Sequence, residues 1–176
     1  MASRVSVLRL VAAIAWIAVS AGGSAAVAQG PPAPDPLALA RLWDREHVDL
    51  PVAPLVTHRE VESRLRAVRD AAPDLFALEE IGRSVEGRAI YHLAFGRGPF
   101  TVLLWSQMHG DEPTATSALF DLFEYVRRHR TDPAVAGMLG ALTVHVVPIL
   151  NPDGAERFQR RNAQGLDMNR DALLLQ

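Results

Sequence analysis

Two apolar runs joined by one amphipathic segment constrain the fold of this chain more than any other feature. Residues 101–107 (TVLLWSQ) and 141–150 (ALTVHVVPIL) are apolar along most of their length, which predicts buried strands. The first run is so continuously apolar that we expect a central strand covered on both faces. Between the runs, Pro113 suits the first position of a helix. Apolar residues then recur at helical spacing and predict a helix over residues 113–130: Ala115, Ala118, Leu119, Leu122, Phe123 and Val126.

Strand, helix and strand in this order predict a βαβ unit with a right-handed crossover, and therefore an α/β fold. The second strand is followed by the turn residues NPDG. Ahead of the unit, Thr57 and Glu60 form a capping-box pattern that predicts a helix over residues 58–71. The runs at 75–81 and 89–95 flank a glycine-bearing turn and predict an antiparallel pair of strands.

The N-terminal region carries a targeting pattern. Basic residues, an apolar run over residues 10–19 and small residues of the A-x-A type predict a cleaved signal peptide, residues 1–28. A membrane anchor is the alternative, but a bilayer span needs about 20 apolar residues. We therefore expect an exported protein, periplasmic or extracellular, without stable membrane insertion. Residues 29–54 read as a proline-rich linker and N-terminal segment with a short helix over 37–50, and residues 55–176 as the folded domain.

Composition limits which partners and metal ligands are available. The chain has 18 basic and 20 acidic residues and a formal net charge of -2, which gives no electrostatic case for binding nucleic acid. It contains no cysteine, so any metal must be held by His, Asp or Glu side chains.

His109 and Glu112 are three residues apart in the turn that connects the predicted strand at 101–107 to the predicted helix at 113–130. That turn lies at the carboxyl end of a strand, where open α/β sheets place their ligands. Two histidines and one glutamate, with water in the fourth position, form a recognised catalytic zinc site. The alternative is a glutamate that caps the helix beside an incidental histidine. The pair predicts part of a zinc site, in which a third ligand is still required.

A second polar cluster lies within residues 151–171. It contains four arginines and two interleaved asparagines: Arg157, Arg160, Arg161, Arg170, Asn162 and Asn169. One reading is a solvated basic loop. The other is a carboxylate-binding site, because arginine offers a planar pair of donors and asparagine adds a neutral amide donor.

The motifs MHGDE, PILNPDG, RRNAQG and DMNRD occur in this order, and together they resemble the zinc metallocarboxypeptidase family (carboxypeptidase A-like). The segment GRSVEGRAIYHLAFGRG is similar to the hairpin that precedes them in that family. The resemblance covers residues 55–176, the N-terminal part of the family's catalytic domain. It implies an α/β fold with a mixed, mostly parallel sheet and helices on both faces. It also implies one Zn2+ ion and a peptide or peptide-like substrate with a free C-terminal carboxylate.

The resemblance further assigns roles to individual residues. His109 and Glu112 match two zinc ligands, and Arg160 matches the arginine that polarises the scissile carbonyl. Asn169 and Arg170 match the pair that binds the substrate's terminal carboxylate. Arg161 is a further substrate-binding candidate, since a shift of one residue in register would exchange it with Arg160.

The sequence also departs from the family pattern. Asp171 follows the Asn–Arg pair where the family often has asparagine. The family's second histidine ligand and its general-base glutamate fall beyond Gln176, and His129 and His145 are the weak local substitutes. We therefore expect an N-terminal fragment of a secreted carboxypeptidase that is inactive alone. The alternatives are a cell-wall peptide amidase, an amino-acid deacylase, or a non-catalytic module that binds peptide C-termini.

Overall fold

The computed structural model describes residues 35–47 and 57–171. The predicted signal peptide, half of the predicted linker segment (29–34 and 48–54) and the last five residues lie outside the described residues. The chain divides into two compact units, residues 1–45 and 46–176. The first contains most of helix α2, Pro36–Glu46, which corresponds to the helix expected over 37–50. Among the described helices, none has the length and apolar character that a membrane crossing needs.

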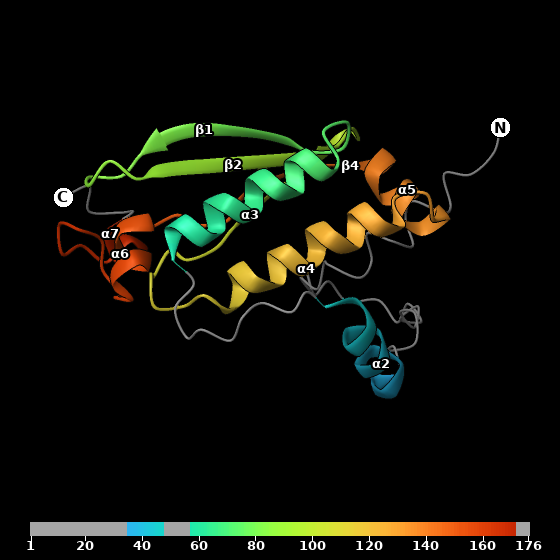
Figure 1. The fold of residues 1–176 in the computed structure, drawn as a ribbon, viewed down its shortest axis with the longest axis horizontal. Helices are drawn as coiled ribbons and strands as arrows, with labels where there is room; N and C mark the ends of the chain where they lie inside the picture. Colours follow the sequence, from blue (N-terminus) through green and yellow to red (C-terminus); the bar gives the residue numbers. More distant parts are fainter. Residues whose placement is uncertain (1–34, 48–56, 172–176) are drawn as a thin grey trace, which may run out of the picture. The chain divides into compact units, whose positions relative to one another are not determined.

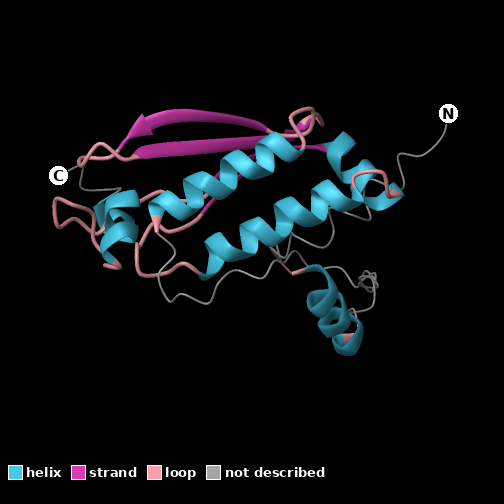
Figure 2. Cartoon of the chain, in the orientation of Figure 1, coloured by secondary structure: helices cyan, strands magenta, loops and turns pink. Residues whose placement is uncertain are grey.

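The second unit is built on a four-stranded mixed sheet (Figures 1 and 2). Its strands are β1 (Ala77–Arg83), β2 (Ala89–Gly96), β3 (Phe100–Trp105) and β4 (Leu142–Val147), in the order β1-β2-β4-β3. The pairs β1–β2 and β2–β4 are antiparallel, and β3–β4 is parallel. The predicted hairpin, the predicted parallel pair and the α/β class are confirmed.

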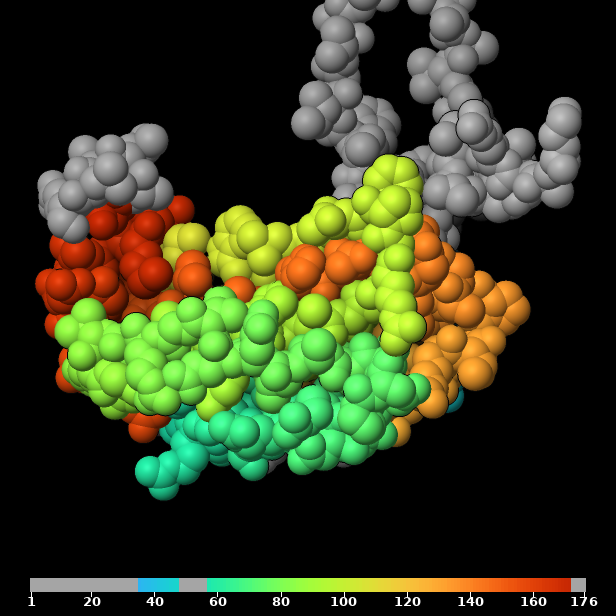
Figure 3. All heavy atoms as spheres, turned by 90° about the horizontal axis from the view of Figure 1, so that it is seen from above, coloured from blue at the N-terminus to red at the C-terminus, as the bar shows by residue number. Residues whose placement is uncertain are grey.

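One expectation about β3 is wrong. We expected a central strand, but within the described residues β3 lies at the end of the sheet and pairs with β4 alone. Figure 3 shows β4, in orange, between the green of β2 and the yellow-green of β3. Leu103 and Trp105 project from the face opposite the helices and are 56% and 50% exposed. The apolar run shows that β3 can be buried on both faces. Which strands and helices lie beside it depends on other parts of the chain.

Two long helices, α3 (His58–Ala71) and α4 (Thr114–His129), lie on the same side of the sheet (Figure 1). The capping box is confirmed, because the Thr57 hydroxyl accepts from the Glu60 amide and the Glu60 carboxylate accepts from the Thr57 amide. Helix α5 (Pro133–Ala141) was not predicted. Its sequence, PAVAGMLGA, is apolar without helical periodicity and contains two glycines, so it carries little local signal.

The segment predicted as an NPDG turn begins helix α6 (Pro152–Arg157) instead. The Asn151 side chain accepts a hydrogen bond from the Gly154 amide, and Pro152 takes the first helical position. Both residues are common at helix starts, because the cap satisfies a free amide and proline has none to satisfy. A last short helix, α7, spans Met168–Asp171.

The core lies between the helices and the inner face of the sheet. Phe123 of α4 is fully buried and makes edge-to-face contacts with Phe76, Phe95 and Phe120. Aromatic pairs favour this geometry because the positive ring edge meets the negative face. The packed core fixes α4 against β2 and β4, and so fixes the position of the β3–α4 loop.

Candidate metal centre

The loop between β3 and α4 brings His109 and Glu112 together. His109 is buried, whereas the Glu112 side chain is 62% exposed. The His109 Nδ1 atom lies 3.1 Å from Glu112 Oε1. An imidazole nitrogen and a carboxylate oxygen thus face each other at the carboxyl end of β3, as the spacing of the two residues predicted.

Asp167 is part of this arrangement and was not predicted as a site residue. Its Oδ1 atom lies 3.1 Å from His109 Nε2, so the histidine has a carboxylate on each side. Burial alone would raise the pKa of Asp167, but hydrogen bonds from His109, the Asn169 amide and Arg160 outweigh it and lower the pKa. A carboxylate on one ring nitrogen of a histidine is the usual support for a metal-binding imidazole. The motif DMNRD contained Asp167, but its partner lies 58 residues earlier in the chain.

Arg160 joins the same cluster. Its Nη1 atom lies 3.1 Å from His109 Nδ1 and 3.5 Å from Glu112 Oε1, and its Nε donates to Asp167 Oδ2 at 3.0 Å. A guanidinium is only a donor, so His109 Nδ1 must be the acceptor nitrogen and Nε2 must carry the proton shared with Asp167. In this tautomer the Nδ1 lone pair accepts from Arg160, and a metal ion bound at Nδ1 would take the place of that donor.

The other predicted site residues are placed differently. Arg161 directs its Nη1 to the Gly165 carbonyl at 2.7 Å, within its own loop. Arg160 is therefore the arginine of the two that the structure brings to His109. Asn169 and Arg170 lie on α7 with exposed side chains, and Arg170 Nη1 is 3.5 Å from the Asn169 carbonyl.

The two histidines considered as substitutes for a third ligand are engaged elsewhere. His145 Nδ1 lies 2.8 Å from His92 Nε2 across β2 and β4, and His129 Nδ1 lies 3.0 Å from Asp132 Oδ2 at the end of α4. Over residues 35–47 and 57–171, no group of three His, Cys, Asp or Glu side chains has the arrangement of a metal site.

The residues around His109 fit one side of a zinc site. A neutral imidazole nitrogen and a carboxylate oxygen are both ligands that zinc accepts, and Asp167 supplies the outer support. Asp111, between His109 and Glu112 in the sequence, has a buried Oδ1 atom with no hydrogen-bond partner in the described part of the chain. Buried carboxylate oxygens are normally paired, so the loop has negative character that favours a cation.

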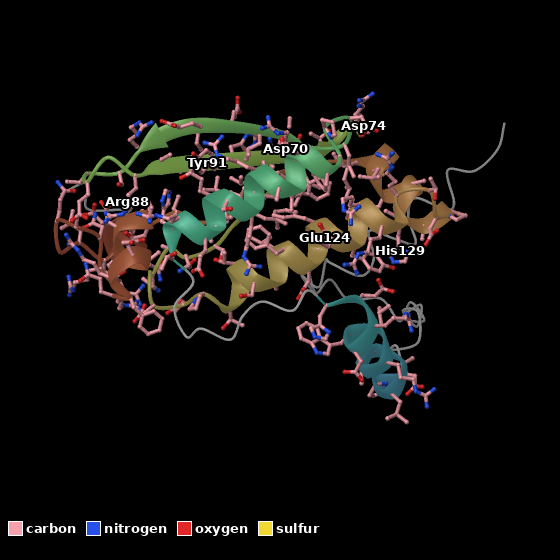
Figure 4. The ribbon with its side chains drawn as sticks, in the orientation of Figure 1. Asp70, Asp74, Arg88, Tyr91, Glu124 and His129 are labelled. Carbon is pink, nitrogen blue, oxygen red and sulfur yellow. The ribbon has the colours of Figure 1, made fainter. Side chains whose placement is uncertain are left out.

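A buried ion pair ties the hairpin to helix α6 beside the site. Asp153 accepts hydrogen bonds from the Ser84 hydroxyl and from Arg88 Nη1, both at 2.7 Å, and from the Glu86 amide at 3.2 Å. Figure 4 shows Arg88 at the end of the hairpin near α6. Burial tends to raise the pKa of Asp153, but the bonds from Ser84, Arg88 and the Glu86 amide outweigh it and lower the pKa.

Helix α6 in turn contacts both halves of the site. The side-chain amide of Asn151 (Nδ2) donates to the carbonyls of Met108 and Arg160, at 3.3 and 3.4 Å. A side chain on Gly110 would lie 2.0 Å from the backbone of Gly154. The loop that carries His109 and the segment that carries Arg160 are therefore packed against the same short helix.

The lowered pKa of Asp153 predicts how stability depends on pH. A carboxyl group whose folded pKa lies below its unfolded value of about 3.9 stabilises the protein above that value. The contribution is lost as the pH falls through the folded pKa. We expect Asp153→Asn to lower the free energy of unfolding by about 2 kcal/mol at pH 7. Urea unfolding should show the difference from the original chain shrinking as the pH is lowered from 6 toward 3.

Asp74 is the matched control for this experiment. It pairs with Arg130 at 2.8 Å, but its side chain is 69% exposed (Figure 4). Water screens such a pair, so Asp74→Asn should have a much smaller effect. Equal effects of the two substitutions would show that the buried Asp153 pair does not stabilise the fold.

Comparisons with known proteins identify the family of this chain. The sequence profile of the family described as "Zinc carboxypeptidase" matches residues 61–171. Carboxypeptidase M of Mus musculus is 31% identical over 134 residues, which are 65% of this chain and 30% of that protein. Carboxypeptidase E of Caenorhabditis elegans is 30% identical over 133 residues, covering 64% of this chain and 28% of that protein.

Solved structures give the same result. A metallo-carboxypeptidase from Burkholderia cenocepacia superposes with a TM-score of 0.61 at 26% identity, over 68% of this chain and 33% of its own. One from Pseudomonas aeruginosa, in complex with (2-guanidinoethylmercapto)succinic acid, gives a TM-score of 0.53 at 26% identity, over 68% and 32%. The chain thus spans about a third or less of these relatives' length, within the first part of a metallocarboxypeptidase fold. On the match over residues 61–171, the chain belongs to the zinc carboxypeptidase family.

Proposed function

We propose that this chain forms part of a zinc-dependent carboxypeptidase that removes C-terminal residues from peptides. The observation that carries the proposal is the cluster of Asp167, His109, Glu112 and Arg160 at the carboxyl end of β3. In this cluster His109 and Glu112 are the proposed metal ligands, Asp167 is the carboxylate that supports His109, and Arg160 is the cationic donor. Family membership supports hydrolysis as the reaction.

In the proposed mechanism, His109 Nδ1 and Glu112 would hold the ion, and Asp167 would keep the proton on His109 Nε2. A bound zinc ion would polarise the substrate carbonyl and make a bound water more acidic. Arg160 donates to the carbonyl oxygen, where negative charge develops in the transition state. Its side chain is 42% exposed, so it has room to leave His109 Nδ1, as metal binding at that nitrogen would require.

Recognition of the substrate end is assigned to Asn169 and Arg170. Both side chains are exposed at α7, beside the segment that carries Arg160 and Asp167. A guanidinium and an amide bind a carboxylate through several donors at once. The Pseudomonas aeruginosa relative was solved with a succinic acid derivative, which supports carboxylate binding in this family. Arg161 is not needed for this role.

The activity is proposed for a complete catalytic domain. Catalytic zinc sites of this type use three protein ligands and water, and the described residues bring two of them together. We expect the 176-residue chain alone to bind zinc weakly and to lack peptidase activity, because two ligands leave the ion mostly hydrated. The signal pattern in residues 1–28 supports export of the protein to the periplasm or the exterior.

The test compares two substrates of one sequence. A peptide with a free C-terminus should lose its last residue in a zinc-dependent reaction of the complete domain, whereas its C-terminal amide should be cleaved at least about tenfold more slowly, since one charged hydrogen bond is worth about 1.5–3 kcal/mol. Mass spectrometry of the products measures both. Equal cleavage of the amide would favour the amidase alternative, and zinc-independent binding without cleavage would favour the non-catalytic module.

A further inference from the structure

We propose that Gln107 is a positioning residue for the metal-ligand pair, held in place by Thr116 at the start of α4. The proposal rests on the proposed function, since it concerns the same His109 and Glu112. The Gln107 side chain is buried and spans the loop. Its Oε1 atom accepts from the Thr116 hydroxyl at 2.8 Å, and its Nε2 atom donates to the Gly110 carbonyl at 3.0 Å.

The direction of these hydrogen bonds follows from the donor inventory. The Gly110 carbonyl only accepts, so the Gln107 amide nitrogen must face it and the amide oxygen must face Thr116. Thr116 gives its proton to Gln107, with the Pro148 carbonyl a longer second acceptor at 3.1 Å. Ser106, 2.9 Å from Thr116, must then be the donor in that contact. Ser106, Gln107 and Thr116 are all buried, so each bond is protected from water.

The backbone at Gln107 shows why such support is needed. Gln107 adopts a left-handed conformation with a φ of 43°, which L-residues other than glycine rarely adopt. Its carbonyl accepts from the Asn151 amide at 3.0 Å, and the Ser106 carbonyl accepts from the Leu150 amide at 2.9 Å. The chain therefore continues the β3–β4 pairing through Gln107 and then turns sharply into His109. A strained backbone conformation persists where several surrounding interactions hold it in place.

The arginine side of the site also contains a residue with positive φ. Within the described residues, Phe158 is the other non-glycine residue with positive φ, at 48°. It lies two residues before Arg160, as Gln107 lies two residues before His109. At Phe158 the left-handed conformation is the C-cap of α6, a common way for a helix to end. Gln107 differs from Phe158 in having a buried side chain that bonds across its loop.

The Gln107 amide holds the loop between the two ligands. Gly110 follows His109 and precedes Glu112 by two residues, and its carbonyl is fixed by Gln107. Its Cα packs on α6, where a side chain would lie 2.0 Å from Gly154. Gly110 is thus held by the Gln107 bond on its carbonyl and by α6 on its Cα. Loss of the Gln107 bond frees the carbonyl and lets His109 and Glu112 separate. The expected consequence is weaker metal binding.

The test measures Zn2+ affinity of the 176-residue chain by NMR, through the ring resonances of His109. Two variants replace a side chain by an apolar one of similar size. Thr116→Val removes the hydroxyl on α4 that donates to Gln107. Gln107→Met removes both the acceptor for Thr116 and the donor to the Gly110 carbonyl. Both should weaken zinc binding about tenfold, since supporting contacts around metal ligands are worth about 10- to 100-fold in affinity. Thr116→Ser keeps the hydroxyl and should restore binding to within about twofold of the original.

Thr143→Val is the matched stability control. The Thr143 hydroxyl donates to the Gly98 carbonyl at 2.7 Å, in the turn before β3 and away from the metal-ligand loop. Thr143→Val should lower the urea midpoint of unfolding, as Thr116→Val does, but leave zinc affinity unchanged. If Thr116→Val does not fold, Gln107→Met carries the test, because its change lies in the loop.

The outcomes separate this inference from the proposed function. Because two ligands bind zinc weakly, the titration extends to a large excess of Zn2+. If that excess leaves the His109 resonances unchanged, or if His109→Ala binds zinc as well as the original chain does, the proposed metal site is wrong. If the original chain binds zinc through His109 but Gln107→Met and Thr116→Val bind it equally well, the positioning role of Gln107 is wrong and the metal site stands. A loss of affinity in Thr143→Val equal to that in Thr116→Val would also overturn the inference.

Discussion

Replacing His109 by alanine is expected to lower the turnover of the complete catalytic domain by about a thousandfold or more. His109 supplies a ligand from a buried, preoriented ring, with Asp167 at 3.1 Å fixing its tautomer. Without it, Glu112 alone remains of the pair, on a largely exposed side chain. Metal-ion catalysis is worth several kcal/mol, and each 1.36 kcal/mol is a factor of ten in rate. Steady-state kinetics with added zinc, together with metal analysis after dialysis, measure the loss.

His145→Ala is the control for this substitution. His145 lies on β4 and pairs with His92 at 2.8 Å, so its loss should leave zinc content and turnover within a few-fold of the original enzyme. Retained zinc and turnover in His109→Ala would contradict the assignment of His109 as a ligand. The same losses in both variants would indicate a general effect on folding.

Arg160→Ala and Arg170→Ala are expected to change different kinetic constants. Arg160 lies at the metal-ligand pair, 3.1 Å from His109 Nδ1, and is assigned to charge that develops during the reaction. Removing such a donor lowers kcat by about 100- to 1,000-fold. Arg170 is assigned to a carboxylate present throughout, so its loss should mainly raise KM, by roughly 10- to 100-fold for one charged hydrogen bond.

Arg161→Ala separates the two neighbouring arginines. Its guanidinium donates to the Gly165 carbonyl, so the substitution should change kcat and KM far less than Arg160→Ala does. Steady-state kinetics of the three variants on one peptide substrate provide the comparison. A larger fall in kcat for Arg161→Ala than for Arg160→Ala would show that the register of the two arginines is reversed.

The parts of the fold that local interactions determine were predictable from the sequence. The Thr57–Glu60 capping box uses hydrogen bonds over three residues, so its pattern identifies the start of α3. The hairpin of β1 and β2 follows from two strand-like runs around a short turn. The proximity of His109 and Glu112 was predictable in the same way, since their spacing and their position after a strand are both local.

Features that depend on distant contacts were not predictable. The NPDG segment fits a turn or a helix start. It forms α6 where Asp153 is held by Ser84 and Arg88, more than 60 residues earlier in the chain. Asp167 meets His109 across 58 residues, and no spacing rule links them. The position of β3 at the sheet edge likewise depends on strand order, which its apolar run does not encode.

The assignment of His109 and Glu112 as zinc ligands is the central claim, and anomalous diffraction at the zinc edge tests it most directly. Crystals of the complete catalytic domain grown with Zn2+ should show one strong anomalous peak. It should lie about 2.0–2.2 Å from His109 Nδ1 and from a Glu112 carboxylate oxygen, with Asp167 still at His109 Nε2. A zinc peak bound by His129 or His145 and absent beside His109 and Glu112 would contradict the account.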